Sequence, residues 1–85
     1  MEFNWTQGKS PYRQTCRIDV GDKAHLTIYT MLRNRKYAYI ISYAPNARYY
    51  LESNLIESNA IFTKVSVLKA AEIMAYRLHK ILTEA

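Results

Sequence analysis

The chain has 85 residues, 49% of them hydrophobic and 22% charged, with a formal net charge of +5. This length predicts one domain with a small core, and the composition excludes a disordered chain. No apolar run approaches the roughly 18 residues that cross a bilayer, and the start lacks a secretory pattern, so we expect a cytoplasmic protein without a membrane partner. The single cysteine excludes an internal disulfide, and no metal site or cofactor is expected.

The first part of the chain predicts two paired strands. Polar and apolar side chains alternate over residues 13–20, which is the period of a strand with one exposed face. A three-residue turn at 21–23 aligns its apolar face with that of residues 24–32. The predicted register therefore pairs Ile18 with Leu26.

The middle of the chain predicts the rest of an antiparallel meander. A turn with Asn34-Arg35 at its tip leads into residues 37–44, which are rich in the aromatic and β-branched residues typical of a central strand. Beyond these we expect a further strand over residues 48–52, a polar loop over 53–59 and a short edge strand over 60–65.

The last segment changes to a helical period. Apolar residues recur at spacings of three and four after Ser66, the expected N-cap, so a helix is predicted over residues 66–84. The predicted fold class is α+β, with an antiparallel meander sheet of three to five strands packed against one C-terminal amphipathic helix. A single domain would cover residues 1–85, with an arm or short strand at 1–12 and the sheet within 13–65.

Catalytic constellations are missing from the sequence, and we expect the protein not to be an enzyme. Cys16 and His25 fall on opposite faces of the predicted sheet, so they could not share a proton. His25 and His79 are expected to be solvated polar residues. Two glycines are too few for a phosphate-binding loop.

A basic, tyrosine-containing sheet face is the first candidate binding site. On the predicted register, basic residues lie beside Tyr29 on the face opposite the helix, where Thr27 and Ser42 would also lie. Guanidinium groups hold phosphates, and aromatic rings stack on bases. The alternative is that these are ordinary outer residues of a half-exposed sheet. The predicted nucleic-acid-binding residues are Arg13, Arg17, Tyr29, Arg33, Arg35 and Lys36, and the leading predicted function is a small DNA- or RNA-binding accessory or regulatory protein.

The polar side of the predicted helix is the second candidate site. Ile73 and Tyr76 lie there among Lys69 and Lys80. One interpretation is a contact with a protein partner or a homodimer contact; the alternative is that these are ordinary exposed apolar residues, which are common on protein surfaces. The first interpretation favours an alternative function, a phage-type inhibitor or adaptor that binds a host protein, of the anti-defence or anti-CRISPR class. A further alternative is a sponge for small anionic nucleotides.

Overall fold

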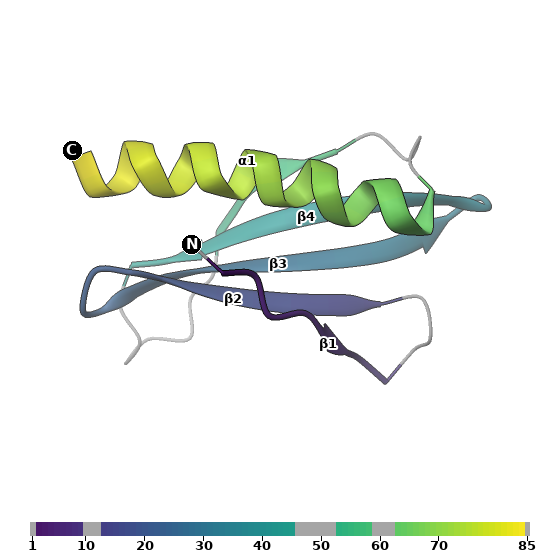
Figure 1. Ribbon diagram of the computed structural model, residues 1–85, viewed down its shortest axis with the longest axis horizontal. Coiled ribbons are helices and arrows are strands. Elements are labelled where there is room, and N and C mark those ends of the chain that lie inside the picture. Colours follow the sequence, from purple (N-terminus) through teal and green to yellow (C-terminus); the bar gives the residue numbers. More distant parts are fainter. Residues whose placement is uncertain (1, 10–12, 46–52, 59–62, 85) are drawn as a thin grey trace.

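The computed structural model describes residues 2–9, 13–45, 53–58 and 63–84. Over these residues the strands form one five-stranded antiparallel sheet in the order β1-β2-β3-β4-β5, and the helix runs across one face of it (Figure 1). The predicted α+β class, a meander sheet with one C-terminal helix, is confirmed. The elements are β1 (Thr6–Gln7), β2 (Gln14–Val20), β3 (Ala24–Arg33), β4 (Lys36–Ala44), β5 (Ser53–Glu57) and α1 (Lys64–Glu84).

Two short turns set the predicted register. Gly21, with a φ of 69°, opens the three-residue turn between β2 and β3, and Ile18 pairs with Leu26 as predicted. Asn34 and Arg35 have φ values of 50° and 64° and form a two-residue turn between β3 and β4. Turns with both central residues left-handed match the twist of a hairpin, so the backbone passes directly from β3 into β4.

The core lies between the sheet and α1. Small residues of the helix, Ala71 and Ala75, are fully buried and let α1 approach the strands closely. Phe3 and Trp5 of the N-terminal segment pack against the same core. Buried together are Cys16, Ile18, Val20, Leu26, Ile28, Tyr39, Ile41, Val67, Ala71 and Ala75.

The polar segment after residue 52 corrects one prediction. Residues 53–57, expected in a loop, pair with β4 as strand β5, and a bulge between Ile41 and Ser42 shifts their register. Polarity misled the prediction because an edge strand is held by backbone hydrogen bonds to its neighbour, which side-chain type does not report. The strand predicted over 48–52 lies outside the described residues.

The start of the helix corrects another prediction. α1 begins at Lys64 and includes Val65, and Thr63 before it is not in a strand, so the edge strand predicted over 60–65 is wrong at 63–65; residues 60–62 lie outside the described residues. The Ser66 N–H donates to Thr63 Oγ1 (3.1 Å), and the Thr63 N–H donates to Ser66 Oγ (2.9 Å). The Val67 N–H donates to the Thr63 carbonyl, so Thr63 is the N-cap and Ser66 is its reciprocal partner.

Candidate functional site

Cations gather at the β3–β4 hairpin. Arg33 pairs with Lys36 across the strands, Arg35 lies in the turn, and all three are exposed. Arg13 is also exposed and lies at the same end of the sheet. It immediately precedes β2, and the first residue of β2 donates its backbone N–H to Thr30 Oγ1 of β3 (2.9 Å). The guanidinium carbon of Arg13 lies 5.6 Å from the centre of the Tyr29 ring, within the range of a cation–π interaction.

Arg17 lies on the same sheet face but farther from the hairpin tip. It pairs with Thr27, which lies six residues before Arg33 on β3, or about 20 Å at the rise of a strand. Its Nε lies 3.9 Å from Asp19 Oδ1, and both side chains are exposed. The structure therefore brings together five of the six predicted nucleic-acid-binding residues, here called the hairpin cluster: Arg13, Tyr29, Arg33, Arg35 and Lys36.

Acidic residues of the same strands lie at the other end of the sheet. Asp22 lies in the β2–β3 turn, and β3 has ten residues between that turn and the hairpin tip, or about 33 Å. Asp19 pairs with His25, eight residues before Arg33, or about 26 Å. The Debye length is about 8 Å at physiological ionic strength, so these carboxylates do not neutralise the hairpin cluster.

The sheet face opposite α1 is closed over its middle. Thr27 and Ser42 lie on this face as predicted, but they are only 6% and 2% exposed, and Ala38, four residues before Ser42 on β4, is 1% exposed. Short, buried side chains cannot reach a ligand. A contact with this face would therefore be made at the hairpin end and the β2 edge, where the long basic side chains are exposed.

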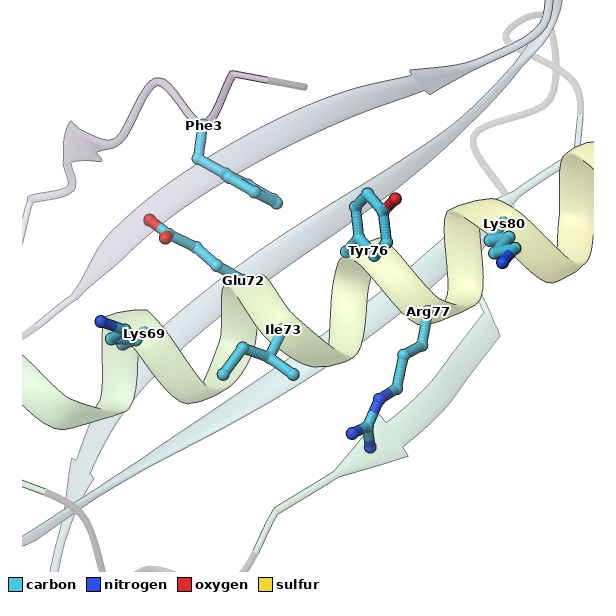
Figure 2. Close-up of a pocket in the computed structure, with 7 residues that line it drawn as sticks. All are labelled: Phe3, Lys69, Glu72, Ile73, Tyr76, Arg77 and Lys80. Carbon is cyan, nitrogen blue, oxygen red and sulfur yellow. The ribbon is translucent and has the colours of Figure 1, made fainter.

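A groove on the exposed side of α1 is the second candidate site (Figure 2). Its volume is about 470 Å³, and the lining includes all four predicted partner-contact residues: Lys69, Ile73, Tyr76 and Lys80. Glu72 and Arg77 of α1 and Phe3 of the N-terminal segment complete the lining. Sequence reasoning missed Phe3, because no local pattern reports that the N-terminal segment returns to the helix.

One hydrogen bond holds the N-terminal segment beside α1. Trp5 Nε1 donates to Glu72 Oε1 at 2.8 Å, across 67 positions of the chain. Because Trp5 also packs against the core, the bond places the neighbouring Phe3 where it closes one side of the groove. The carboxylate of Glu72 is thus already engaged within the protein.

Cys16 and His25 lie on opposite faces of the sheet, as the sequence predicts, although His25 is half-buried and not fully solvated. Cys16 is 1% exposed in the core, whereas His25 pairs with Asp19 and belongs to the opposite sheet face. Burial raises the pKa of the Cys16 thiol and the Glu72 carboxylate adds to the rise, while a backbone hydrogen bond at Asn4 acts against it. A buried thiol that resists ionisation is a poor nucleophile. His79 is half-buried on α1.

Comparison with known proteins identifies no relative. No protein-family model, no curated protein and no solved structure gives a significant match to this chain. Within residues 2–9, 13–45, 53–58 and 63–84, no group of three or more His, Cys, Asp or Glu side chains could hold a metal ion. In the same ranges, no helix is both long enough and apolar enough to cross a bilayer.

Proposed function

We propose that the protein is a small nucleic-acid-binding accessory or regulatory protein that holds the phosphate backbone with the hairpin cluster. The observation that supports this most is the charge arrangement: four exposed cations lie toward one end of the sheet, about 20 Å or more along the strands from Asp19 and Asp22. A cationic end that Asp19 and Asp22 do not screen attracts polyanions and steers their approach. Catalysis has no part in this function.

The shape of the cluster suits a nucleic acid. Two antiparallel strands joined by a tight turn make a ribbon that the major groove of DNA can admit. Arg33 and Lys36 lie side by side on this ribbon and Arg35 is at its tip, so phosphates on either side of a groove are within reach of a cation.

Tyr29 has a supporting role in this proposal. Its side chain is half-buried and Arg13 lies over the ring, so the ring holds the guanidinium in place instead of presenting a bare stacking surface. A guanidinium held in position can donate two hydrogen bonds to a phosphate with little further loss of side-chain entropy.

The proposal is tested by fluorescence-anisotropy titration of labelled duplex DNA, single-stranded DNA and RNA at two salt concentrations. We expect salt-sensitive binding to at least one probe, and Arg33→Ala or Arg13→Ala should weaken it several-fold and reduce the salt slope by about 1. Arg17→Ala is the matched control, because it removes the same charge about 20 Å from Arg33 and should have a much smaller effect.

Two outcomes would contradict the proposal. The first is an absence of binding to all three probes at low salt. The second is an equal loss of affinity in Arg17→Ala and Arg33→Ala, which would mean that net charge alone attracts the probe. Thermal stabilisation by free nucleotides without binding to long nucleic acid would instead favour the nucleotide sponge.

A second candidate function, an inhibitor or adaptor that binds a host protein, is favoured by the groove on α1. The groove combines apolar and basic residues at one exposed surface, and Tyr and Arg are the residue types that dominate protein interfaces. It is separate from the hairpin cluster, so both binding activities could belong to one molecule.

A further inference from the structure

The exposed side of α1 combines apolar and basic side chains in one stripe. Four large apolar residues there are 50% to 79% exposed, and three exposed cations lie between them. At 3.6 residues per turn, all seven fall within about 160° of the helix circumference, opposite the buried Val67, Ala71 and Ala75. The basic-apolar stripe consists of Val65, Ile73, Tyr76 and Ile81 with Lys69, Arg77 and Lys80.

The charge of the stripe is not balanced by the acids of the helix. Glu72 lies at its margin and already accepts the hydrogen bond from Trp5. Glu84 lies within the arc of the stripe at its C-terminal end, four residues after Lys80, so three cations of the stripe face one free carboxylate of α1. The stripe therefore keeps an excess of positive charge, which is greatest away from Glu84. A surface of this kind is complementary to an acidic partner.

The middle of the stripe lies in a shallow, open groove. Phe3 and α1 together form the groove of about 470 Å³, and Ile73 and Tyr76 are among the residues that line it (Figure 2). A concave apolar site with charged residues around it fits the protruding side chain of a partner. From Val65 to Ile81 the stripe covers sixteen residues of rise, or about 24 Å.

We infer that the basic-apolar stripe docks an acidic amphipathic segment of another protein. Such a segment would be about four helical turns long to match the stripe. Its apolar side chains would enter the groove beside Ile73 and Tyr76, and its carboxylates would pair with Lys69 and Lys80. This inference does not depend on the proposed nucleic-acid binding, because the two surfaces share no residue.

A second copy of the chain fits the stripe poorly. Lys69 stands toward one end of the groove and Lys80 toward the other. Antiparallel packing centred on the groove would place Lys69 against Lys80, and parallel packing would place each cation against itself. A two-fold interface uses the same patch on both subunits, so like charges oppose each other in both of these arrangements.

The test begins with a display library of random 16-residue peptides, selected against the wild-type protein. We expect the enriched peptides to carry several Asp or Glu together with Leu, Phe or Trp at spacings of three and four. One enriched peptide, labelled with a fluorophore, is then titrated by anisotropy. Its binding should weaken as salt is raised.

Variants of the stripe give the decisive comparison. Both the double change Lys69→Glu with Lys80→Glu and the single change Ile73→Ser should weaken peptide binding by about tenfold or more. These side chains are exposed, so thermal unfolding should show that both variants fold. Lys36→Glu is the matched control: it reverses an equally exposed charge in the hairpin cluster and should leave peptide binding unchanged while weakening nucleic-acid binding.

Several outcomes would overturn the inference. Selection that enriches no peptides, or enriches peptides without acids, would do so, as would peptide binding that survives both stripe variants. Binding to phosphatidylserine vesicles that the stripe variants abolish would assign the stripe to an anionic membrane surface. A dimer in sedimentation that Ile73→Ser dissociates would assign it to a second copy. Each of these results leaves nucleic-acid binding by the hairpin cluster to be judged by Arg33→Ala.

Discussion

At the residue scale, the backbone of Arg35 has a left-handed conformation, which is energetically unfavourable for any residue with a Cβ atom. Its φ of 64° is left-handed, where an L-residue with a Cβ is strained and where two-residue hairpin turns favour Gly. A strained residue that is over-determined by its surroundings is a pointer to function. Arg35 places a positive charge at the hairpin tip, and a role of this charge in binding would account for a strained residue at this position.

The substitution Arg35→Gly separates stability from binding. Removing the side chain relieves the left-handed strain, partly offset by the greater freedom of glycine in the unfolded chain, so we expect unfolding in urea to show a gain of roughly 0.5–1 kcal/mol. Nucleic-acid affinity should fall at the same time, because one cation of the hairpin cluster is lost. A more stable variant with unchanged affinity would show that Arg35 has no part in binding.

At the element scale, the position of the helix start follows from a pair of side chains. Ser66 resembles an N-cap in the sequence because it precedes the apolar period, yet Thr63 three residues earlier makes the first intrahelical contact. The side-chain oxygen of each residue accepts a hydrogen bond from the backbone N–H of the other, which is the geometry of a capping box. Helices whose first turn is polar are easily predicted to start too late for this reason.

The substitution Thr63→Ala tests that cap. It removes the acceptor for the Ser66 N–H, so the free energy of unfolding in urea should fall by about 1 kcal/mol. Thr83→Ala is the control at the other end of α1, where the hydroxyl donates to the His79 carbonyl at an exposed position and should contribute little. An equal loss of stability in both variants would argue against a special role for Thr63.

At the scale of the whole molecule, the sheet separates charge along its length. The hairpin cluster lies at one end of β3, and Asp22 lies in the turn at the other, within a molecule whose longest extent is 36 Å. Because that separation exceeds several Debye lengths of about 8 Å, a polyanion would meet one cationic end and not an averaged net charge of +5.

An exchange of charges between the two ends tests this arrangement. The double variant Lys36→Asp with Asp22→Lys keeps the net charge at +5, and both positions are exposed, so the fold should be retained. If the local field of the hairpin cluster attracts nucleic acid, anisotropy titration should show a clear loss of affinity. Affinity equal to that of the wild type would indicate attraction by net charge.

Local sequence patterns predicted most of the sheet but not all of its surface. The alternation in β2 and the short turns at Gly21 and Asn34 were sufficient for strand pairing, because turn length and side-chain period together leave one register that buries both apolar faces. They also placed Thr27 and Ser42 on the correct face. Their burial was not predictable, because exposure depends on what surrounds a side chain and not on its direction alone.

The candidate sites divide along the same line. The sequence by itself determined the composition of each surface: Arg33, Arg35 and Lys36 are neighbours in the chain, and Ile73 and Tyr76 are neighbours on one helix face, so local geometry alone brings them together. Only the tertiary structure decided that Arg13 belongs to the hairpin cluster while Arg17 does not, and that Phe3 closes the groove on α1. Those placements depend on contacts between segments far apart in the chain, which arise when apolar faces pack into a common core and leave no signal in any short stretch of sequence.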